Sequence, residues 1–464
     1  MNHPVPAQCD LILDGGIVVT MDESRPLIHR GTVAITGDTI VAVGDSSQVS
    51  FEAKRRVDCT DKIVMPGLID CHTHLFQTLG RGLGEGLSLV SWIREFMWPY
   101  ARAISSEDAV VAAQLGAIEA ARSGTTTVLD NHYAPADLET TLSVANAIET
   151  VGLRGAVARG MWGPLTDIAR THLAESSHFK YSIADEVDMT RDGINTRPPG
   201  SKVEIWPSAI MIAYVDQELV RRSVELAIEM GTGWHTHCSE IELDPQVYLE
   251  AFGLRPIEWL HREGLLESHG TIAHGIWLDD QEIERLGTTS TGIAYCPVSH
   301  QYLPLGVMRL RSLRDSGALV GLGTDGPAAG HRQDLFECMK HGILLQRAHT
   351  LDPLVSNAHE ALDMATKTAA DYMGINAGVL ATGRLADIAV VGVNRPHLQP
   401  LSDPVATLAY AVRGSDVDMT IVGGQVIYED GRCSLVDEQS VMDEAAARTP
   451  DLLQRAGIST PLTK

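Results

Sequence analysis

Residues 64–74 read Val-Met-Pro-Gly-Leu-Ile-Asp-Cys-His-Thr-His, an apolar run that begins near Pro-Gly and ends at two histidines. Side chains two residues apart project from the same face of an extended strand, so His72 and His74 would lie side by side. Two imidazoles held in this way are half of a metal site. Such a pair also arises by chance in a chain with 18 histidines. The metal interpretation therefore depends on further ligands elsewhere in the chain.

Length and composition restrict the classes of protein that fit. The chain has 464 residues, 44% of them hydrophobic, and a formal net charge of −24. The charge argues against nucleic-acid and membrane partners, which need clustered Lys and Arg. No apolar run is long enough to span a membrane, and residues 1–9 lack a secretory signal, so we expect a cytoplasmic protein. Seven scattered cysteines without a Cys-x-x-Cys pair make a disulfide framework or a zinc ribbon unexpected.

The two ends of the chain predict one small β-domain. Short β-rich runs separated by Gly-containing turns occupy residues 9–43, and similar runs recur at 385–391 and 419–428. We predict a β-sandwich built from residues 1–61 and 376–435, with the middle of the chain inserted as a second domain. In the remaining tail, 436–464, we expect a helix that is interrupted at Thr449-Pro450 and covers the surface or an oligomer contact.

The middle of the chain, residues 62–375, alternates strand-like and helical segments. Helices are predicted over 106–122 and 216–230, and each is followed closely by glycine. The expected strands span 63–74, 125–132, 153–161, 203–210, 233–238, 271–277, 293–298 and 319–324. Eight strands alternating with helices predict an α/β fold, the (β/α)₈ TIM barrel, whose functional residues gather at the C-terminal ends of the strands.

Polar residues follow five of these strands, as a barrel active site requires. They are His72 and His74, residues 130–132, residues 235–240, His274 and Asp325. Two histidines from the first strand, one from the fifth and a carboxylate from the eighth suit a divalent transition metal and leave room for water. Such a metal would lower the pKa of water towards neutrality.

Each residue of this set has an expected role and a simpler alternative. Asp325 would contact the metal and accept the water proton, Glu240 would carry a proton to the substrate, and His274 would orient the water or the oxyanion. Taken singly, Asp325 could be a turn residue, Glu240 a helix start and His237 a packed core histidine. His235 is assigned to buried packing or support, because only one of the two histidines is needed.

Four motifs in this order carry a resemblance to a known family. They are Pro66-Gly-Leu-Ile-Asp-Cys-His-Thr-His, Thr236-His-Cys-Ser-Glu, Ala273-His and Gly323-Thr-Asp-Gly-Pro. Together they resemble the amidohydrolase superfamily, in particular its branch of triazine hydrolases and of cytosine, guanine and S-adenosylhomocysteine deaminases. The resemblance covers nearly the whole chain and includes a sandwich built from both chain ends.

The resemblance implies a ligand set and a catalytic set. The implied metal ligands are His72, His74, His237 and Asp325, and the implied catalytic residues are Glu240, His274 and Asp325. Binuclear branches carry a carboxylated lysine at the end of the fourth strand, but here Lys202 stands at its start. One metal ion is therefore expected, with zinc favoured over iron, cobalt or manganese. Relatives commonly form dimers or larger assemblies, so we also expect a homo-oligomer.

The loop after the first strand is expected to line the substrate pocket, as it does in the similar deaminases, with Gln77 as the leading contact. Aromatic and polar residues after strand ends would clamp a flat ligand or pack under loops. Where the branch often has Pro-x-Ser-Asn and Gly-Pro-Ala-Ser-Asn-Asn, this chain carries histidines beside the barrel mouth. The candidate contacts are Gln77, Arg81, Trp92, Trp162, Trp206, His300 and His331.

These residues predict a metal-dependent hydrolase that deaminates a planar N-heterocycle, such as a purine, pterin, pyrimidine or triazine. The same machinery with another leaving group is the alternative: chloride or an alkylamine from a triazine, or an amine from a urea, phenylurea or carbamate. A metal-free scaffold is a remote third possibility. A chain that had lost its metal should also have lost metal ligands, and all four implied ligands are present here. We expect a small-molecule substrate as the partner, with no nucleic acid and no membrane.

Overall fold

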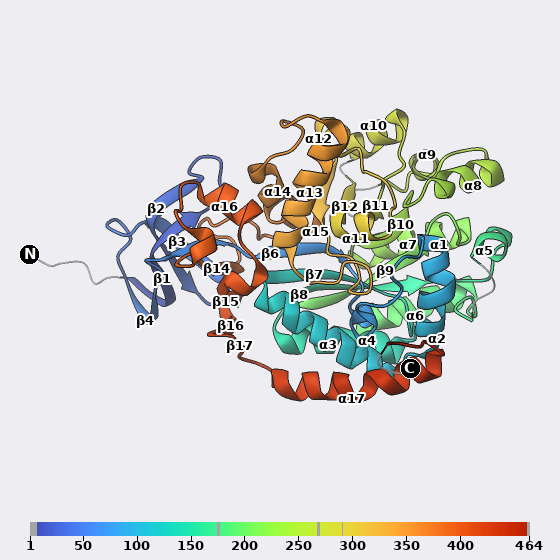
Figure 1. Ribbon diagram of the computed structural model, residues 1–464, viewed down its shortest axis with the longest axis horizontal. Helices are drawn as coiled ribbons and strands as arrows, with labels where there is room; N and C mark the ends of the chain where they lie inside the picture. Colours follow the sequence, from blue (N-terminus) through green and yellow to red (C-terminus); the bar gives the residue numbers. More distant parts are fainter. Residues whose placement is uncertain (1–6, 174–176, 267–269, 290, 462–464) are drawn as a thin grey trace, which may run out of the picture.

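The computed structural model describes residues 7–173, 177–266, 270–289 and 291–461. Its strands form two sheets, one on the left of Figure 1 and one within the larger unit on the right. The left-hand sheet combines strands from residues 7–66 with strands from residues 388–433, and the right-hand sheet contains the middle of the chain. In this described part, no helix is both long and apolar enough to cross a membrane.

The sheet of the larger unit is a barrel of eight parallel strands, counted within the described residues and paired in chain order. They are β6 (Leu68–Thr73), β7 (Thr125–His132), β8 (Arg154–Met161), β9 (Val203–Met211), β10 (Trp234–Cys238), β11 (Gly270–His274), β12 (Gly292–Tyr295) and β13 (Leu319–Leu322). The chain after β13 returns to β6, where the N–H of Asp325 donates to the carbonyl oxygen of His72 at 2.9 Å. The predicted barrel is confirmed.

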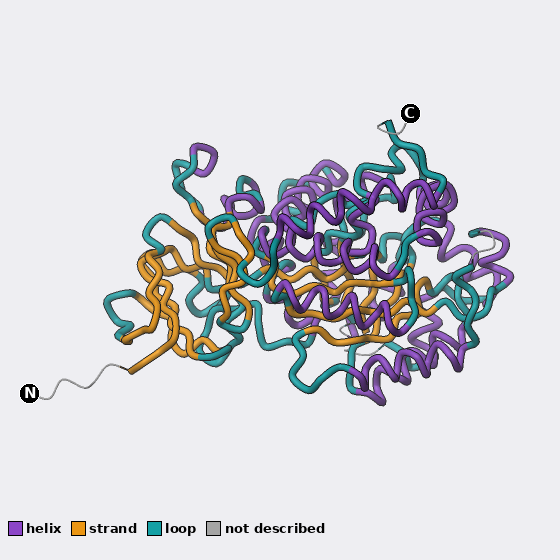
Figure 2. The backbone as a smooth tube through the Cα atoms, turned by 90° about the horizontal axis from the view of Figure 1, so that it is seen from below, coloured by secondary structure: helices purple, strands orange, loops and turns teal. Residues whose placement is uncertain are grey.

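Helices surround the barrel strands (Figure 2). Between β6 and β9 lie η1 (Leu75–Gly80), α1 (Leu89–Ser91), the π-helical η2 (Trp92–Met97), α2 (Trp98–Ala103), α3 (Ser106–Arg122), α4 (Leu138–Val151), α5 (Asp167–His172) and α6 (Ile183–Thr196). After β9 follow α7 (Gln217–Met230), α8 (Leu243–Phe252), α9 (Pro256–Arg262), α10 (Asp280–Thr289), α11 (Pro297–Tyr302), α12 (Leu310–Ser316), α13 (Leu335–Thr350), α14 (Ala358–Met364) and α15 (Lys367–Met373).

Local signals explain why two helices match their predicted ranges closely. Helix α3 begins after Ser105, whose hydroxyl accepts the N–H of Asp108 while the Asp108 carboxylate accepts the N–H of Ser105. Helix α7 begins after Asp216 and ends at Gly231, which adopts a positive φ of 67°. Side-chain acceptors satisfy the first free N–H groups of a helix, and glycine adopts a left-handed conformation without steric cost.

Segments from both ends of the chain form the predicted small β-domain, and their strands belong to one mixed sheet. It contains β1 (Ala7–Val19), β2 (Leu27–Thr36), β3 (Thr39–Asp45), β4 (Phe51–Asp58), β5 (Lys62–Pro66), β14 (Ile388–Gly392), β15 (Val417–Val422), β16 (Gln425–Glu429) and β17 (Arg432–Cys433). The short helices η3 (Pro396–Leu398), α16 (Pro404–Tyr410) and η4 (Gly414–Asp416) connect β14 to β15. Leu13, Val33, Ile388 and Ile421 share one core across the two ends of the chain.

The predicted strand over residues 63–74 is two strands in the structure. Residues 62–66 form β5, which pairs antiparallel with β14, whereas β6 pairs parallel with β7. Between them, the N–H of Gly67 donates to the carbonyl oxygen of Asp387 at 2.9 Å. The chain thus passes from one sheet to the other without a turn, and a continuous apolar run carries no signal of that change of partner.

The tail forms a single helix, α17 (Glu438–Ala456), which contains Pro450. It lies along the bottom of Figure 1 and packs on α2 and α3. Val441, Ala445, Leu452 and Leu453 are buried on both sides of the proline. This continuous apolar face explains why the helix extends through the position where a break was expected, since packing outweighs the loss of one backbone hydrogen bond.

Candidate active site

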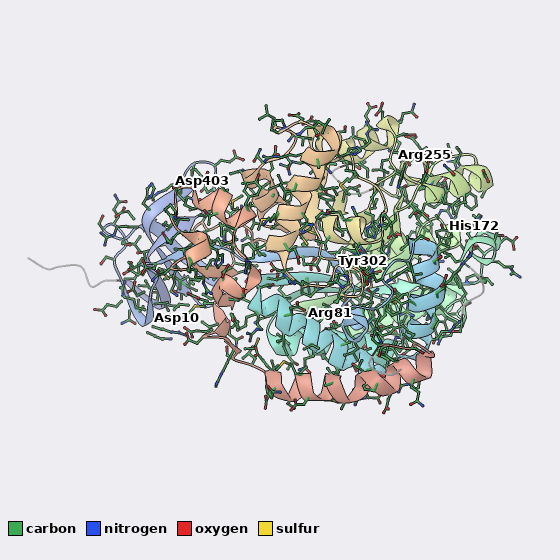
Figure 3. The ribbon with its side chains drawn as sticks, viewed as in Figure 1. Asp10, Arg81, His172, Arg255, Tyr302 and Asp403 are labelled. Carbon is green, nitrogen blue, oxygen red and sulfur yellow. The ribbon has the colours of Figure 1, made fainter. Side chains whose placement is uncertain are left out.

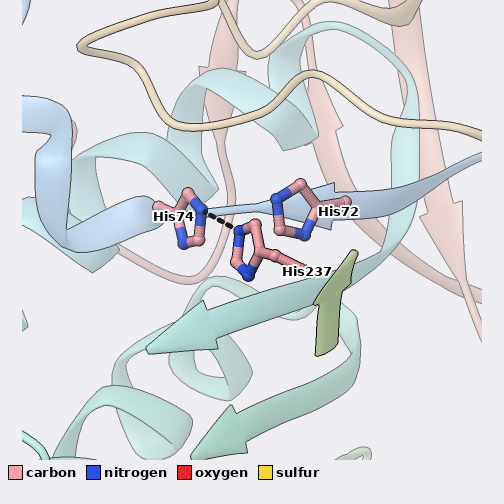
Figure 4. Close-up of side chains that lie close together, drawn as sticks. All are labelled: His72, His74 and His237. Atoms are coloured by element: carbon pink, nitrogen blue, oxygen red, sulfur yellow. Dashed lines mark hydrogen bonds between the residues drawn. The ribbon is translucent and has the colours of Figure 1, made fainter. Parts of the chain in front are cut away.

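Three histidines meet at the C-terminal ends of β6 and β10. His72 belongs to β6, His74 follows it directly and His237 belongs to β10, and the three rings lie close together (Figure 4). Nε2 of His74 lies 3.2 Å from Nε2 of His237, and the ligating atoms of all three residues lie within 4.8 Å of one another. All three side chains are buried. This arrangement can hold a divalent metal ion.

Backbone carbonyl oxygens fix the orientation of two of these rings. Nδ1 of His74 lies 2.6 Å from the oxygen of Asn131, and Nδ1 of His237 lies 2.7 Å from the oxygen of Ile210. Because a carbonyl oxygen only accepts, each Nδ1 must carry the proton and donate it. In each neutral ring, Nε2 then holds a lone pair directed at the shared space, which is the tautomer that binds a metal.

A longer chain of hydrogen bonds fixes the tautomer of His72. The Thr271 hydroxyl donates to the oxygen of Trp234 at 2.7 Å, so it accepts from Nδ1–H of His235 at 2.9 Å. Nε2 of His235 is therefore an acceptor, and it receives Nδ1–H of His72 at 3.0 Å. Nε2 of His72 keeps a lone pair, is buried and has no hydrogen-bond partner. His235 thus orients His72 and does not itself face the shared space.

Asp325 approaches the same space from the loop after β13. Its Oδ1 lies 3.7 Å from Nε2 of His72 and 3.6 Å from Nε2 of His74. Asp325 has a φ of 60° and His274 a φ of 74°, left-handed conformations that non-glycine residues rarely adopt. Such strained residues persist where the surrounding structure holds them, and they cluster at functional sites.

Glu240 and His274 lie next to each other beside the histidine cluster. Oε1 of Glu240 lies 3.6 Å from Nε2 of His274, and both side chains are buried. Burial, with the nearby charges of Asp325 and Asp244, raises the pKa of Glu240 well above its usual range. Burial also lowers the pKa of His274 to about 4. These shifts favour the protonated acid at Glu240 and the neutral ring at His274.

The donor set fits a metal ion on its own chemistry. Burial and the neighbouring histidines lower the pKa of His72 and His237 well below the usual range, so both rings are neutral. Three imidazole lone pairs and a carboxylate oxygen then converge without protons between them. Lone pairs in this arrangement repel one another unless a cation lies among them. Three nitrogens and one oxygen are a ligand set that suits zinc and similar divalent ions.

A buried pocket leads to these groups. The segment after β6 supplies the largest share of its wall. The ends of β9, β10 and β11 and the segments after β7, β8, β10, α11 and β13 supply the rest. Its lining residues are His74, Gln77, Leu89, Trp92, Ile93, Met97, Trp98, Tyr133, Trp162, Ile210, Met211, His237, Glu240, His274, Leu303, Asp325 and Ala329. Three of the predicted substrate contacts, Gln77, Trp92 and Trp162, are therefore at the pocket.

Two of the remaining candidates lie away from that wall. Arg81, labelled in Figure 3, forms an ion pair with Glu119 of α3. It lines a separate open cleft of about 1140 Å³. The residues that line this cleft include no histidine, so it does not resemble the metal centre. His331 packs edge-on against Tyr302, with ring centroids 4.5 Å apart.

Two further candidates support other parts of the barrel. Nε2 of His300 lies 3.1 Å from Nδ1 of His274, so His300 stands behind a reactive residue and not in the pocket wall. Trp206 belongs to a different buried cluster, where its indole N–H donates to Glu204 at 2.9 Å. The motifs predict that these residues follow strand ends, but they do not predict the direction of each side chain.

Tyr133 is a pocket residue that the sequence motifs do not identify. It follows β7 directly, and its hydroxyl accepts the amide N–H of Gln77 at 3.2 Å. Its ring lies edge-on to His74, with centroids 5.2 Å apart. The available signal was its position, one residue after the polar strand end 130–132. Within that segment, His132 is bonded to the oxygen of Pro135 at 2.7 Å and does not join the metal cluster.

Comparisons with known proteins agree with this geometry. Residues 63–427 match the model of the Amidohydrolase family. A 5-methylthioadenosine/S-adenosylhomocysteine deaminase of Haloarcula marismortui is 32% identical, over 97% of this chain and 99% of that protein. A 5'-deoxyadenosine deaminase of Methanothermobacter thermautotrophicus is 33% identical, over 92% of this chain and 95% of that protein.

Solved structures show the same fold. A zinc-bound adenosine deaminase from Xanthomonas campestris superposes with a TM-score of 0.87 at 23% identity and covers 97% of this chain and 100% of its own. A zinc complex of atrazine chlorohydrolase from Arthrobacter aurescens gives a TM-score of 0.85 at 24% identity, over 95% of this chain and 100% of its own. The barrel, its flanking sheet and the family match lead to one assignment: the chain belongs to the amidohydrolase family.

Proposed function

We propose that this protein is a hydrolytic deaminase of a planar, purine-like N-heterocycle and that it uses one zinc ion held by His72, His74, His237 and Asp325. The observation that carries the proposal is the buried pair of Glu240 and His274 beside the histidine cluster. Relatives that match nearly the whole chain are named as deaminases of adenine nucleosides, which supports an amino leaving group.

Each residue has a role in the proposed reaction that follows from whether it can donate or accept a proton. A metal ion held by the four ligands supplies Lewis acidity and lowers the pKa of water beside it. Glu240, whose burial favours the protonated acid, donates to a ring nitrogen of the substrate as water adds to the neighbouring amino-bearing carbon. Asp325 accepts the proton that the water loses and returns it to the amino group. As the carbon–nitrogen bond breaks, the added hydroxyl gives its proton to the Glu240 carboxylate and becomes the carbonyl of the product, and ammonia leaves.

His274 holds the attacking oxygen in place. It is neutral and buried, and its Nε2 faces Glu240 at 3.6 Å while its Nδ1 faces His300 at 3.1 Å. The hydrogen bond between Nδ1 and His300 fixes the orientation of the ring and directs Nε2 towards Glu240, and this orientation lowers the entropic cost of bringing water to the reacting carbon.

A second candidate function uses the same residues with chloride or an alkylamine as the leaving group. The structural likeness to atrazine chlorohydrolase shows the fold alone, but the apolar pocket wall favours this alternative. Parallel assays for ammonia, chloride and alkylamine on purines and chlorotriazines separate the two functions. Chloride release without ammonia release would support the second candidate.

Replacement of Glu240 tests the proposal directly. Glu240→Gln keeps the shape of the side chain but removes its acidic proton, so we expect a loss of about 10²–10⁴-fold in kcat. The variant should keep its metal content and thermal stability, because Glu240 is not among the proposed ligands. Glu242→Gln, on the neighbouring loop and outside the pocket lining, is the matched control and should stay active. A fully active Glu240→Gln variant would contradict the proton-transfer role.

The cellular location and the assembly remain predictions. We propose that the protein is cytoplasmic, which its composition supports. We also propose that it forms a homo-oligomer, because similar proteins commonly form dimers or larger assemblies. Light scattering after size-exclusion chromatography measures the mass directly, and a single chain of 50.1 kDa would contradict an oligomer.

A further inference from the structure

The pocket wall away from the reactive groups is almost entirely apolar. Leu89, Ile93, Met97, Trp98, Trp162 and Leu303 line it. Among the described residues of the lining there is no Lys or Arg, and the carboxylates are Glu240 and Asp325, which the reaction uses. The part of a substrate that lies away from the reactive groups therefore contacts aromatic and aliphatic side chains. An unpaired hydroxyl or charge is costly to bury against such side chains.

Two polar groups stand out against this wall. The amide oxygen of Gln77 is buried without a hydrogen-bond partner, while its N–H donates to the Tyr133 hydroxyl at 3.2 Å. Because the Tyr133 oxygen accepts this bond, its own proton is free to donate. The pair therefore presents one acceptor and one donor to a ligand. A heterocycle that carries an N–H next to an acceptor atom on one edge of its ring can hydrogen-bond to both groups.

The loops hold this polar pair rigidly. A Cβ atom placed on Gly326 would lie 1.9 Å from the Gln77 amide oxygen, so the end of the Gln77 side chain lies directly against the Gly326 backbone. Tyr133 is wedged edge-on against Phe76, with ring centroids 4.7 Å apart, and against Trp162 at 5.9 Å. Polar groups fixed in this way recognise a ligand with little loss of side-chain entropy.

The space that remains is small. The cavity has a volume of about 60 Å³. One water needs about 10–15 Å³ by the same measure, so this is room for about four to six waters. Leu89, Trp92 and Leu303 close over it and are nearly fully buried. A flat base fits such a space with small side-chain movements, whereas a nucleoside adds a whole sugar ring with its hydroxyls.

We infer that this pocket takes an uncharged heterocycle without a sugar, that Gln77 and Tyr133 recognise one edge of its ring, and that nucleosides are disfavoured. The inference rests on the proposed deaminase function and narrows its substrate class. It also distinguishes this protein from the relatives named for nucleoside substrates.

Matched pairs of substrates test the inference. We would measure kcat/KM for ammonia release from adenine against adenosine and 5'-deoxyadenosine, from guanine against guanosine, and from cytosine against cytidine. The free base of at least one pair should exceed its nucleoside by about 10²-fold or more, the scale at which pocket shape discriminates between related compounds. A nucleoside that equals or exceeds its base in every active pair would overturn the inference.

If none of these compounds releases ammonia, the deaminase proposal loses its support, but the pocket remains testable. Calorimetry on metal-loaded Glu240→Gln then measures binding of the same pairs without turnover. Binding of a base with no binding of its nucleoside supports the inference. Equal binding of both, or binding of neither, contradicts it.

Two variants test the proposed pocket, and a third is the matched control. Tyr133→Phe removes the donor and should lower kcat/KM for the preferred base about tenfold or more, with unchanged metal content. Tyr100→Phe is the matched control, because Tyr100 is also buried and bonded, to the oxygen of Phe76 at 2.8 Å, but lies outside the pocket lining. Leu303→Ala enlarges the pocket and should reduce the preference for base over nucleoside. Equal effects of the two tyrosine variants would contradict the role of Tyr133.

Discussion

At the scale of single residues, the least expected finding is the influence of a histidine that faces away from the shared space. His235 accepts Nδ1–H of His72 and donates to Thr271, and this fixes the lone pair of His72 on the nitrogen that faces Asp325. Groups that support metal ligands in this way set both the tautomer and the basicity of the ligand.

His235→Phe should therefore weaken metal binding by about 10–100-fold while leaving His72 in place. The phenyl ring fills the space but accepts no hydrogen bond, so His72 can carry its proton on either nitrogen. Competition with a chelator of known zinc affinity measures the effect. Thr271→Val, which removes the acceptor one step further away, should give a smaller loss in the same direction. An unchanged zinc affinity in His235→Phe would contradict the hydrogen-bond chain.

The sequence predicted which residue types would meet but not every direction in which they point. His72, His74, His237 and Asp325 are brought together because strand ends of a parallel barrel share one face. Gln77 lines the pocket as expected, whereas His300 stands behind His274. Side-chain direction in loops depends on packing against distant segments, and a local motif carries no information about it.

At the scale of elements, the pocket wall depends on a buried ion pair between β8 and α6. Arg159 lies 2.7 Å from Glu186, and both side chains are almost fully buried. The other carboxylate oxygen of Glu186 accepts the N–H groups of Trp162 and Gly163 at 3.0 and 3.2 Å. This pair therefore fixes the turn that presents Trp162 to the pocket.

Glu186→Ala should destabilise the protein by about 3–5 kcal/mol, because it leaves the guanidinium of Arg159 buried without its partner. Urea unfolding measures the free energy. The control is Glu229→Gln, which breaks the solvent-exposed pair with Arg191 and should leave the free energy of unfolding nearly unchanged. Equal small effects in both variants would contradict the structural role of the buried pair.

Element boundaries were predictable where local chemistry marks them. The range of β7 and the start of α3 follow from patterning and from the Ser105 cap. The division between β5 and β6 was not predictable, because residues 63–74 form one apolar run and only long-range pairing with β14 separates them. The continuity of α17 through Pro450 likewise depends on tertiary packing.

At the scale of the whole molecule, the proposed metal site is formed by segments that are far apart in the sequence. Its proposed ligands lie at the ends of β6 and β10 and in the loop after β13, so their side chains converge only in the folded state. A metal ion that binds the folded chain in preference to the unfolded chain shifts the unfolding equilibrium by mass action.

Removal of metal should therefore lower the midpoint of thermal unfolding. Free zinc at about 1,000 times its Kd should restore about 4 kcal/mol of stability. Differential scanning fluorimetry with and without zinc measures the shift, and His237→Ala is the control that should lose most of this response. A zinc response that persists undiminished in His237→Ala would place the metal elsewhere.

The measurement that tests the central claim most directly is a zinc titration of metal-free protein, with ammonia release from a purine-like substrate as the signal. We predict that chelation abolishes ammonia release and that activity returns in proportion to zinc, reaching its plateau at one equivalent per chain. Ammonia release from metal-free protein, or a plateau at two equivalents, would contradict a single catalytic zinc held by His72, His74, His237 and Asp325.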